Sequence, residues 1–524
     1  MKTIRLIRQT VAMICILICC SVPLYSQEIS SARLDSLVEN TMKSFNVPGI
    51  AVAVVKDNRI VHMKGYGVSS IITGKKTDEN TLFAIASNSK AFTAAALAIL
   101  VDEGKIEWDT HVTDIIPEFK LYDPYVTNEF TIRDLLTHRS GLGLGAGDLM
   151  LWPDGTLFTL NDIIYNMRYL KPVSSFRTKY DYDNLMYLVA GEVVSRVSGM
   201  SWEDFIEDRI MTPLGMSRSA ACYSRIKDKS NVIDAHIYTH GKVQRIPMNF
   251  TPVGNAAGGI FSNISDLSKW VMMQLNGGKY GDNLSKSIFS QKVGREMWSP
   301  QTIIPASSYD YKSNFAAYGL GWRVNDINGY KQVSHTGGLS GVVTQVTMIP
   351  ELKLGIIVLT NQQASGAYVT ITNTIKDTYL GIKGRDRLKE NIEALRRNSS
   401  SARDEVSKVW NKVASSAKFA PGSEDLKSYT GKYRDNWFGI VNITLENGAL
   451  RFASEMSPQL KGTLCFYTGD TFVVKWDERS FDADAFVWYS KNIEGVPSGF
   501  KMKAISPETD FSYDFQDLDF YRVK

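Results

Sequence analysis

The hydrophobic pattern near the start of the chain predicts a β-hairpin followed by a buried helix. Residues 50–55 and 60–66 are two strand-like runs rich in apolar residues, and the turn dipeptide Asp57-Asn58 separates them. Residues 91–100 are almost wholly alanine, leucine and other apolar types. A helix that is apolar on every side is buried, so we expect this one in the core.

Helical patterns dominate residues 160–270, whereas residues 318–361 return to strand patterns. The clearest helical runs are 185–197 and 265–275, and the clearest strand runs are 342–348 and 354–359. Strands therefore come from both ends of this part of the chain and helices from its middle. We predict one α/β (α+β) domain over residues 27–384, with a sheet completed by distant segments and a helical lobe inserted between them.

The chain changes character after residue 384. Residues 385–422 are rich in charged side chains and end at Pro421-Gly422, which predicts a charged helical linker. Residues 423–524 are β-rich, and Asn447-Gly448 between two strand patterns is a strong hairpin signal. The strand patterns are 440–445, 449–453, 472–476, 485–489 and 511–515. We predict a separate all-β antiparallel domain, a meander or a small barrel.

Residues 1–26 have the pattern of a signal peptide. Lys2, Arg5 and Arg8 form a basic start, an apolar run covers 11–20, and Ser26 is a small residue at a plausible cleavage point. The apolar run is too short for a comfortable membrane span. We therefore expect an exported protein, periplasmic or secreted, with no membrane insertion after the signal is cleaved. An uncleaved anchor is the alternative.

Composition is that of a soluble globular protein and argues against several partners. Of 524 residues, 44% are hydrophobic and 22% charged, and the formal net charge is +4. Removal of the three positive charges of the signal leaves +1, which gives no electrostatic case for binding nucleic acid or an anionic membrane. Cys222 and Cys465 remain, in different predicted domains, and are a weak disulfide candidate.

Ser87 and Lys90 form an S-x-x-K pattern, which can place a hydroxyl beside an amine. On a helix, residues three apart share a face, so the Lys90 amine can reach the Ser87 hydroxyl. A serine nucleophile needs such a base, and partial burial makes a lysine neutral. The pattern alone is weak because three other pairs match it: Ser224-Lys227, Ser415-Lys418 and Ser498-Lys501. Only Ser87 follows a strand-like stretch and opens a long buried helix.

Two more elements carry candidate chemistry. Tyr182-Asp183-Asn184 is a Y-x-N pattern: a tyrosine near a cationic lysine can shift toward phenolate, and an asparagine amide can hold a substrate carbonyl. In isolation, a core tyrosine and a helix-capping asparagine would be the ordinary interpretation. His335-Thr336-Gly337-Gly338 precedes a strand pattern, where glycine permits close approach to the backbone and a free N–H can join an oxyanion hole. Its ordinary interpretation is a turn at a strand edge with a surface histidine.

These three elements, in this order, resemble the S-x-x-K, Y-x-N and K/H-T-G motifs of class C β-lactamase-related serine hydrolases. Segments 131–142, 257–260 and 318–322 resemble further conserved text of that family, and the resemblance covers residues 35–382. The family includes β-lactamases, low-molecular-weight penicillin-binding proteins, D-aminopeptidases, carboxylesterases and some acyltransferases. It implies a β-lactamase/transpeptidase-like fold with helices flanking an antiparallel sheet. Residues 423–524 resemble the small β domain often appended to such hydrolases.

The resemblance implies a catalytic role for three residues. Ser87 would attack a carbonyl carbon, while Lys90 and Tyr182 would together handle its proton, protonate the leaving group and activate the incoming water or alcohol. The N–H groups of Ser87 and Gly338 would form the oxyanion hole.

The resemblance also implies substrate-binding roles. Asn184 would orient the acyl side chain, His335 would hydrogen-bond near Tyr182 and the substrate, and Gly337 would lie beside Gly338. Most β-lactamases and transpeptidases of this family have lysine where this chain has His335. A neutral imidazole binds a carboxylate less well than an ammonium does, so efficient β-lactam hydrolysis is not expected. The H-T-G form is more typical of the esterase and aminopeptidase branches.

Three functions are compatible with the sequence. The leading one is hydrolysis of an ester or amide in a small-molecule or peptide-like substrate, through an acyl-enzyme at Ser87. One alternative is acyl transfer to an alcohol such as a steroid or polyketide hydroxyl, and another is a penicillin-binding sensor that turns over little. No cofactor is expected, and His236 and His240 lack a third ligand in metal-binding spacing. Loops 143–160 and 300–317 are expected to shape specificity.

Overall fold

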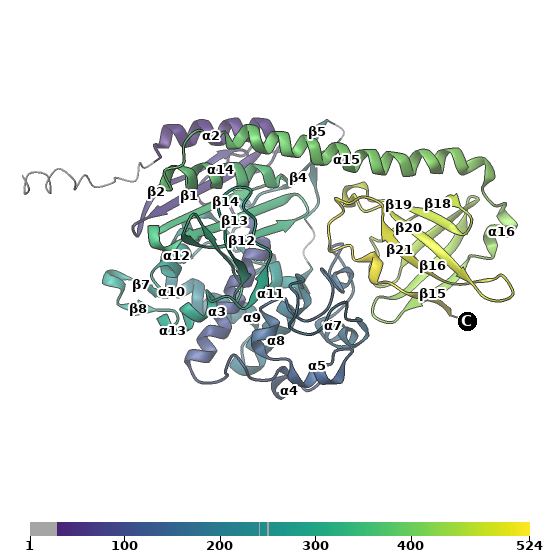
Figure 1. The fold of residues 1–524 in the computed structure, drawn as a ribbon, viewed down its shortest axis with the longest axis horizontal. Coiled ribbons are helices and arrows are strands. Elements are labelled where there is room, and N and C mark those ends of the chain that lie inside the picture. The colour runs from purple at the N-terminus through teal and green to yellow at the C-terminus, as the bar shows by residue number, and fades with distance from the viewer. Residues whose placement is uncertain (1–28, 240, 249–250, 524) are drawn as a thin grey trace, which may run out of the picture.

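Two folded parts joined by a long helix make up the computed structural model, which describes residues 29–239, 241–248 and 251–523 (Figure 1). The predicted signal peptide lies outside these residues. Across these ranges, no helix combines the length and the apolar character that a membrane span requires. Cys222 and Cys465 are both free.

An antiparallel sheet of eight strands forms the middle layer of the larger part. Its order is β2-β1-β14-β13-β12-β11-β10-β9. The strands are β1 (Gly49–Lys56), β2 (Arg59–Gly67), β9 (Thr302–Ile304), β10 (Ala316–Tyr318), β11 (Arg323–Ile327), β12 (Tyr330–Leu339), β13 (Val342–Ile349) and β14 (Leu354–Thr360). β1 pairs with β14, with Ile50 opposite Thr360, so the prediction that distant segments complete one sheet is confirmed.

Helices cover both faces of this sheet because its central strands are apolar on both sides. Ile50, Val52 and Val54 of β1 are buried with α2 (Ser31–Phe45) and α14 (Ser365–Tyr379). Ala51, Ala53 and Val55, which alternate with these residues, belong to the second core. This core also contains side chains of α3 (Ser89–Asp102) and α12 (Ile264–Leu275). This alternation follows from the period of two along a strand.

A helical lobe lies beyond the second face, as predicted. Its main helices are α4 (Val112–Ile115), α5 (Pro124–Glu129), α6 (Ile132–Leu135), α7 (Leu160–Asn166), α8 (Leu185–Ser198), α9 (Trp202–Ile206), α10 (Thr212–Leu214), α11 (Asn255–Gly258) and α13 (Gln291–Met297). One hairpin, β4 (Ala235–Thr239) with β5 (Lys242–Ile246), interrupts the helical region and was not predicted. α3 and α8 pack against each other at the base of the candidate site.

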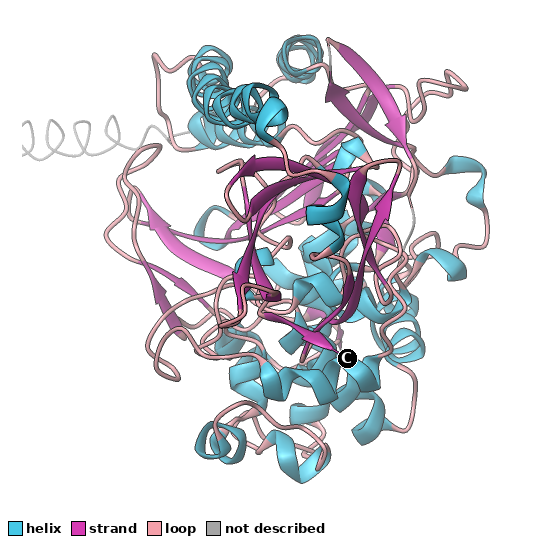
Figure 2. Cartoon of the chain, turned by 90° about the vertical axis from the view of Figure 1, so that its right-hand side faces the viewer, coloured by secondary structure: helices cyan, strands magenta, loops and turns pink. Residues whose placement is uncertain are grey.

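The charged segment after residue 384 forms α15 (Arg387–Ser416), which runs along the top of the molecule to the second part (Figure 1). That part is a closed barrel of eight antiparallel strands, seen with its strands arranged as a ring in Figure 2, so the all-β prediction is confirmed. After α16 (Ser423–Lys427), its strands are β15 (Gly431–Asp435), β16 (Gly439–Glu446), β17 (Ala449–Ser454), β18 (Lys461–Thr468), β19 (Thr471–Trp476), β20 (Ala485–Lys491), β21 (Pro497–Ala504) and β22 (Phe520–Val523).

The strand predicted at residues 511–515 is wrong. This segment lies between β21 and β22 and consists of turns that lead into a short 3-10 helix, Phe515–Asp517. Its polar side chains bond to the larger domain instead of alternating toward solvent: Ser512 contacts Asp148, and Asp514 contacts the backbone at Gly147 and Leu149. The segment is therefore part of a loop of the barrel that contacts the larger domain. Residues Asp510–Asp514 of this loop are called the barrel loop.

Candidate active site

Ser87 lies in a single 3-10 turn, Ala86–Asn88, between the short strand β3 (Phe83–Ala84) and α3. β3 pairs with β6 (Phe261–Ser262), which anchors the entry to the turn. Ala86 adopts a left-handed φ of 50°, a rare conformation for a residue with a Cβ atom, so the turn before Ser87 is strained. Residues 91–100 of α3 are buried, as the pattern predicted, and the helix holds Ser87 on a rigid base.

Lys90 reaches the Ser87 hydroxyl as the S-x-x-K spacing predicts. Its Nζ lies 3.1 Å from Ser87 Oγ, 2.7 Å from Asn184 Oδ1 and 3.0 Å from the carbonyl oxygen of Ala257. The Lys90 side chain is fully buried, and this burial lowers its pKa to about 7, although Asp148 and Asp183 oppose the shift. An amine with this pKa is substantially neutral at physiological pH.

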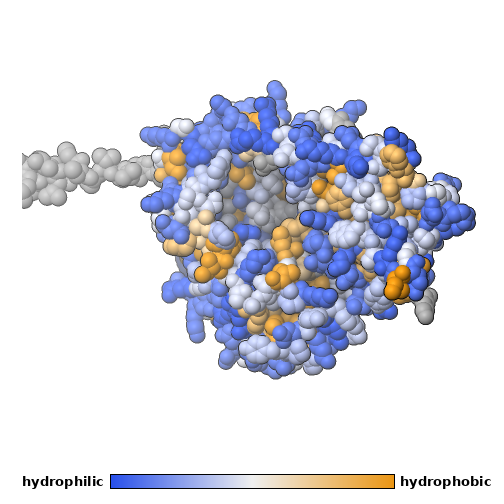
Figure 3. Space-filling view, turned by 45° about the vertical axis from the view of Figure 1, so that its right-hand side comes forward, coloured by the Kyte–Doolittle hydropathy of each residue, from blue (hydrophilic) through white to orange (hydrophobic). Residues whose placement is uncertain are grey.

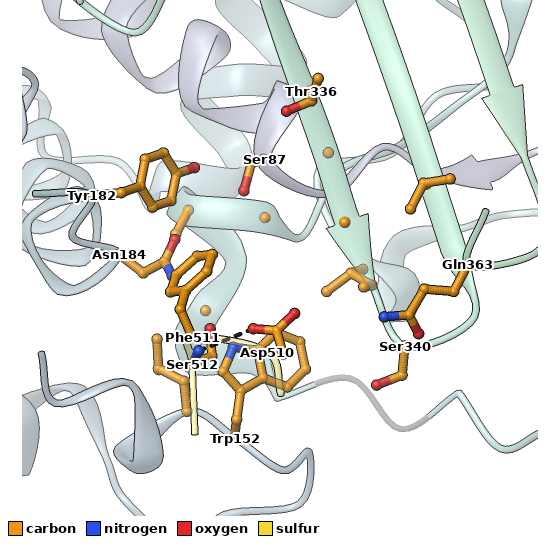
Figure 4. Close-up of a pocket in the computed structure, with 18 of the residues that line it drawn as sticks. Ser87, Trp152, Tyr182, Asn184, Thr336, Ser340, Gln363, Asp510, Phe511 and Ser512 are labelled. Atoms are coloured by element: carbon orange, nitrogen blue, oxygen red, sulfur yellow. Dashed lines mark hydrogen bonds between the residues drawn. The ribbon is translucent and has the colours of Figure 1, made fainter. Parts of the chain in front are cut away.

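Tyr182 points its hydroxyl toward Ser87 (Figure 4). Its ring lies beside the Lys90 amine, with Nζ 4.8 Å from the ring centroid, and the His138 ring packs against it at a tilt of 32°, with the centroids 4.1 Å apart. Burial raises the pKa of Tyr182 well above its ordinary value, and the nearby Ser87 only partly opposes this. The expected shift toward phenolate is therefore wrong: the buried tyrosine stays protonated, and the neighbour with the lowered pKa is Lys90.

Asn184 has both ends of its amide occupied. Its Oδ1 accepts a hydrogen bond from Lys90, and its Nδ2 donates to Asp148 Oδ2 at 2.7 Å. The residue lies at the N-terminus of α8, but its side chain makes no capping hydrogen bond, so the helix-capping interpretation does not hold. Asn184 lines the cavity, and the hydrogen bonds of its amide go to Lys90 and Asp148 of the protein itself.

His335 lies on β12 and is buried, not on the surface. Its Nε2 lies 2.8 Å from the Tyr318 hydroxyl and its Nδ1 lies 2.6 Å from the Thr336 carbonyl oxygen. The His335 ring lies near Tyr182, with the ring centroids 6.3 Å apart, and the hydrogen bonds of its two nitrogens go to Tyr318 and Thr336. Burial and the positive charge of Lys90 lower the pKa of His335 to about 3, so the imidazole is neutral.

Gly337 and Gly338 differ in what surrounds them. A Cβ atom on Gly337 would lie 2.2 Å from the Ile85 carbonyl oxygen, because β12 passes close to the turn that holds Ser87. A Cβ atom on Gly338 would meet nothing within 4 Å. Gly337 thus lets β12 approach the turn Ala86–Asn88, hereafter the serine turn. Gly338 is the glycine that leaves space open on the cavity side.

One cavity of about 580 Å³ is lined by six of the candidate residues: Ser87, Tyr182, Asn184, His335, Gly337 and Gly338. On one side lie Ser87, Tyr182 and Asn184, and on the other lie Thr336, Ser340 and Gln363 (Figure 4). Hydrophobic side chains lie beside a hollow on the face of the molecule that Figure 3 shows. The apolar and aromatic residues of the cavity wall are Leu144, Leu151, Trp152, Tyr180, Leu339, Val343, Tyr368, Phe481, Phe511 and Tyr513. The last three come from the barrel.

Sequence reasoning missed several residues that lie in or beside this cavity. Arg323 on β11 places a guanidinium in the wall and donates to the Tyr180 hydroxyl at 2.9 Å. Asp148 and Ser512 bond to each other beside Asn184, although 364 positions separate them in the chain. Of the two predicted specificity loops, 143–160 contributes Leu144, Leu151, Trp152 and Asp154, whereas none of the described lining residues comes from 300–317. Within the described ranges, no cluster of three or more potential ligands is placed to hold a metal ion.

The fold and the matches to known proteins support a serine hydrolase as the class. A family model described as "Beta-lactamase" matches residues 34–378, and the chain belongs to this family. A second model, a domain of unknown function (DUF3471), matches residues 416–522, which include the barrel.

Several curated proteins are similar in sequence. The unguisins hydrolase ungD of Aspergillus violaceofuscus is 27% identical over 434 residues, which cover 78% of this chain and 76% of the fungal protein. The unguisins hydrolase ungD' of Aspergillus campestris is 31% identical, over 63% of this chain and 62% of that protein. Protein flp of Staphylococcus aureus is 26% identical, over 63% of each. For the last two, the chain spans less than two thirds of the relative's length.

Two solved structures share the fold. An octameric penicillin-binding protein homologue from Pyrococcus abyssi superimposes with a TM-score of 0.60 and 22% identity, over 94% of this chain and all of the other. A class C β-lactamase superimposes with a TM-score of 0.54 and 22% identity, over 67% of this chain and 96% of the other. The first match extends over most of both domains, whereas the second covers a smaller share of this chain.

Proposed function

We propose that the protein hydrolyses an ester or a peptide-like amide through an acyl-enzyme formed on Ser87. The hydrogen bonds of Lys90 carry this proposal. Two of its three partners, the Asn184 and Ala257 oxygens, are carbonyl oxygens that can only accept. A neutral amine has two N–H donors and one lone pair, so donation to both carbonyls directs the lone pair at the Ser87 hydroxyl. Lys90 is then placed as the base that removes the Ser87 proton.

The reaction follows from this arrangement. Ser87 Oγ forms a bond to the substrate carbonyl carbon, and its proton passes to Lys90. The bond to the leaving alcohol or amine then breaks, and the proton reaches that group from Lys90, directly or through the Tyr182 hydroxyl. Water next adds to the acyl carbon and gives its proton to Lys90, and the bond to Ser87 breaks. The acid is released, and the Ser87 hydroxyl regains its proton.

The proposed oxyanion site lies between the serine turn and β12. The N–H groups of Ser87 and Gly338 are the donors that the family resemblance assigns, and the lack of a Cβ atom at Gly337 is what allows β12 to lie this close to the turn. Thr344 on β13 also donates to the Ile85 carbonyl at 2.9 Å, which ties the sheet to the serine turn. These contacts support a preorganised site.

The cavity supports a substrate with an apolar or aromatic part and, near Arg323, a negatively charged group. His335 is neutral, so it does not replace the lysine that β-lactamases of this family use, and we expect ester turnover to exceed β-lactam turnover. Two of the relatives are named as unguisins hydrolases, which favours hydrolysis as the outcome of acyl-enzyme formation.

Labelling with a fluorophosphonate tests the nucleophile. Serine hydrolases react through the activated hydroxyl, which displaces fluoride and leaves a phosphonylated serine. We expect Ser87→Ala to abolish labelling, and Ser498→Ala, which removes a serine of a second S-x-x-K pattern, to leave it intact. Persistent labelling of Ser87→Ala would refute the assignment.

Intact-protein mass spectrometry with esters, D-amino-acid peptides and β-lactams distinguishes the three functions. Free acid as the product, with a transient adduct on Ser87, supports hydrolysis. Ester formation when an alcohol is added supports acyl transfer. A long-lived β-lactam adduct with little turnover supports the sensor. The adduct mass identifies the acyl group in each case.

Export is a further part of this proposal and rests on residues 1–26 alone. When the full chain is produced in a bacterium, we expect a mature protein that begins near Gln27 and is recovered from the periplasm or the medium. Full-length chain in the membrane fraction would support the uncleaved anchor instead.

A further inference from the structure

A chain of buried hydrogen bonds connects the C-terminal barrel to the proposed base. Ser512 Oγ in the barrel loop donates to Asp148 Oδ2 at 2.9 Å, and Asn184 Nδ2 donates to the same oxygen at 2.7 Å. The other end of the Asn184 amide accepts from Lys90 at 2.7 Å. Asp148 is fully buried and Ser512 is 6% exposed. The side chains of Asp148, Asn184 and Lys90 therefore connect the barrel loop to Ser87.

Asp148 determines which way the Asn184 amide faces. The Asp148 oxygen accepts from the amide nitrogen, so the amide oxygen is left to face the Lys90 amine. Asp148 Oδ2 also accepts from Ser512, so this oxygen is an acceptor whether or not the carboxyl is charged. If the amide turned over, its oxygen would face this acceptor and its nitrogen would face the N–H groups of Lys90, and both hydrogen bonds would be lost. Buried polar groups left without partners are costly, so Asp148 holds the amide in the orientation that Lys90 needs.

The barrel loop also fixes the backbone on both sides of Asp148. The Asp514 carboxylate accepts from the Gly147 N–H at 2.6 Å and from the Leu149 N–H at 3.0 Å. Phe511 packs edge-on against the Tyr182 ring, with the centroids 5.8 Å apart. The loop thus contacts the segment that carries Asp148 and also Tyr182, which lies beside Ser87.

Adhesion between the domains alone does not explain these contacts. Asp148 and Asp514 are both fully buried, and burial raises the pKa of each carboxyl well above its ordinary value, which shows that their charged forms are disfavoured there. Apolar side chains would join two domains without the desolvation penalty of two buried carboxyls. Instead, Asp148 accepts a hydrogen bond from Asn184, which lines the cavity. Asp514 accepts from the backbone N–H groups on both sides of Asp148.

We propose that the barrel contributes to the active site through Ser512. Ser512 and Asp148 position Asn184 and, through it, the Lys90 amine. The functional meaning of this arrangement rests on the proposed acyl-enzyme at Ser87. Ser512 and Asp148 are positioning residues: neither contacts the Ser87 hydroxyl, and both act through Asn184.

The rate constant for fluorophosphonate labelling measures this positioning without knowledge of the natural substrate. We expect Ser512→Ala to label about tenfold more slowly than the unchanged protein, because one hydrogen bond to a buried carboxyl is lost. Ser512→Thr keeps the hydroxyl and restores most of the rate. Asp148→Ala removes both bonds and slows labelling further. Ser498→Ala is the matched control, since the hydroxyl of this barrel serine donates to the Ser490 carbonyl within the barrel, and it should change the rate less than twofold.

The side-chain amide signal of Asn184, observed by NMR with labelled asparagine and assigned from its loss in Asn184→Ala, gives a readout independent of catalysis. We expect it to shift in Ser512→Ala and Asp148→Ala but not in Ser498→Ala. An unchanged signal and an unchanged labelling rate in Ser512→Ala would overturn the proposal. Equal labelling of Ser87→Ala and the unchanged protein would instead refute the nucleophile, while the Asn184 signal would still decide whether Ser512 positions the amide.

Discussion

Lys90 Nζ lies 3.1 Å from Ser87 Oγ, and its other two hydrogen bonds end on carbonyl oxygens. This arrangement suits an amine that is neutral, because a fully buried ammonium would lose its hydration. Asp148 and Asp183 lie near enough to favour the charged form, so the amine has a pKa of about 7 and not a much lower one. A base of this strength can both accept and return a proton near neutral pH.

The first prediction concerns the pH dependence of acylation. Only neutral Lys90 can accept the Ser87 proton, so the rate should rise with pH as Lys90 loses its own proton, with a midpoint near pH 7. His335, whose pKa is about 3, and Tyr182, whose pKa is raised, keep their protonation states across this range. The labelling rate constant measured from pH 5 to pH 9 gives the profile.

A second buried lysine provides the control for this profile. Lys376 on α14 also has a pKa lowered to about 7 by burial, but it bonds to Gln332 and does not line the cavity. Lys376→Met should therefore keep the midpoint of the labelling profile. A midpoint near 10 in the unchanged protein would contradict the assignment of Lys90 as the base.

The second prediction concerns stability. The pKa of Lys90 is about 7 in the folded protein and about 10.4 in an unfolded chain. Between these values the unfolded state binds one more proton than the folded state, so stability rises with pH. Relative to Lys90→Met, the free energy of unfolding should increase by up to about 1.4 kcal/mol per pH unit from pH 7 to pH 10. Urea titrations of both proteins at several pH values measure this difference, and a difference independent of pH would show that Lys90 keeps an ordinary pKa.

The third prediction separates two neighbouring glycines. Gly337→Ala places a Cβ atom 2.2 Å from the Ile85 carbonyl oxygen, so β12 must move away from the serine turn. We expect it to lose about 1–3 kcal/mol of stability, as overpacked substitutions do, and most of the labelling rate. Gly338→Ala adds the same atom in open space and should keep the thermal unfolding midpoint of the unchanged protein. Equal midpoints for both variants would contradict the close approach.

Local patterns in the sequence predicted much of the fold and the candidate residues. The spacing of Ser87 and Lys90 correctly implied a contact on one helix face, and the apolar run after it correctly implied a buried helix. The strand patterns at both ends of the larger domain correctly implied one shared sheet. These features depend on residues close in sequence or on simple periodicity, which a single sequence contains.

Contacts between distant segments could not be predicted in this way. Phe511, Tyr513 and Phe515 alternate with polar residues as a strand would, yet the polar residues between them bond to a loop more than 360 positions earlier. The phenolate expected at Tyr182 was wrong for a related reason, because its pKa depends on burial by the whole surrounding fold. Arg323 directly follows the family-like segment 318–322, but nothing in that segment indicated that the Arg323 side chain would line the cavity.

The last prediction concerns Arg323 and the substrate's charge. Its guanidinium lines the cavity and its charge acts on the neighbouring His335, so a substrate carboxylate bound there would form charge-assisted hydrogen bonds. Since such bonds contribute about 1.5–3 kcal/mol, Arg323→Gln should lower kcat/KM about 10- to 100-fold for esters that carry a carboxylate, mainly through KM. Neutral p-nitrophenyl esters should lose less than threefold. Equal losses for both would mean that Arg323 supports the cavity wall through Tyr180 and does not bind the substrate, so the comparison of matched charged and neutral esters decides its role.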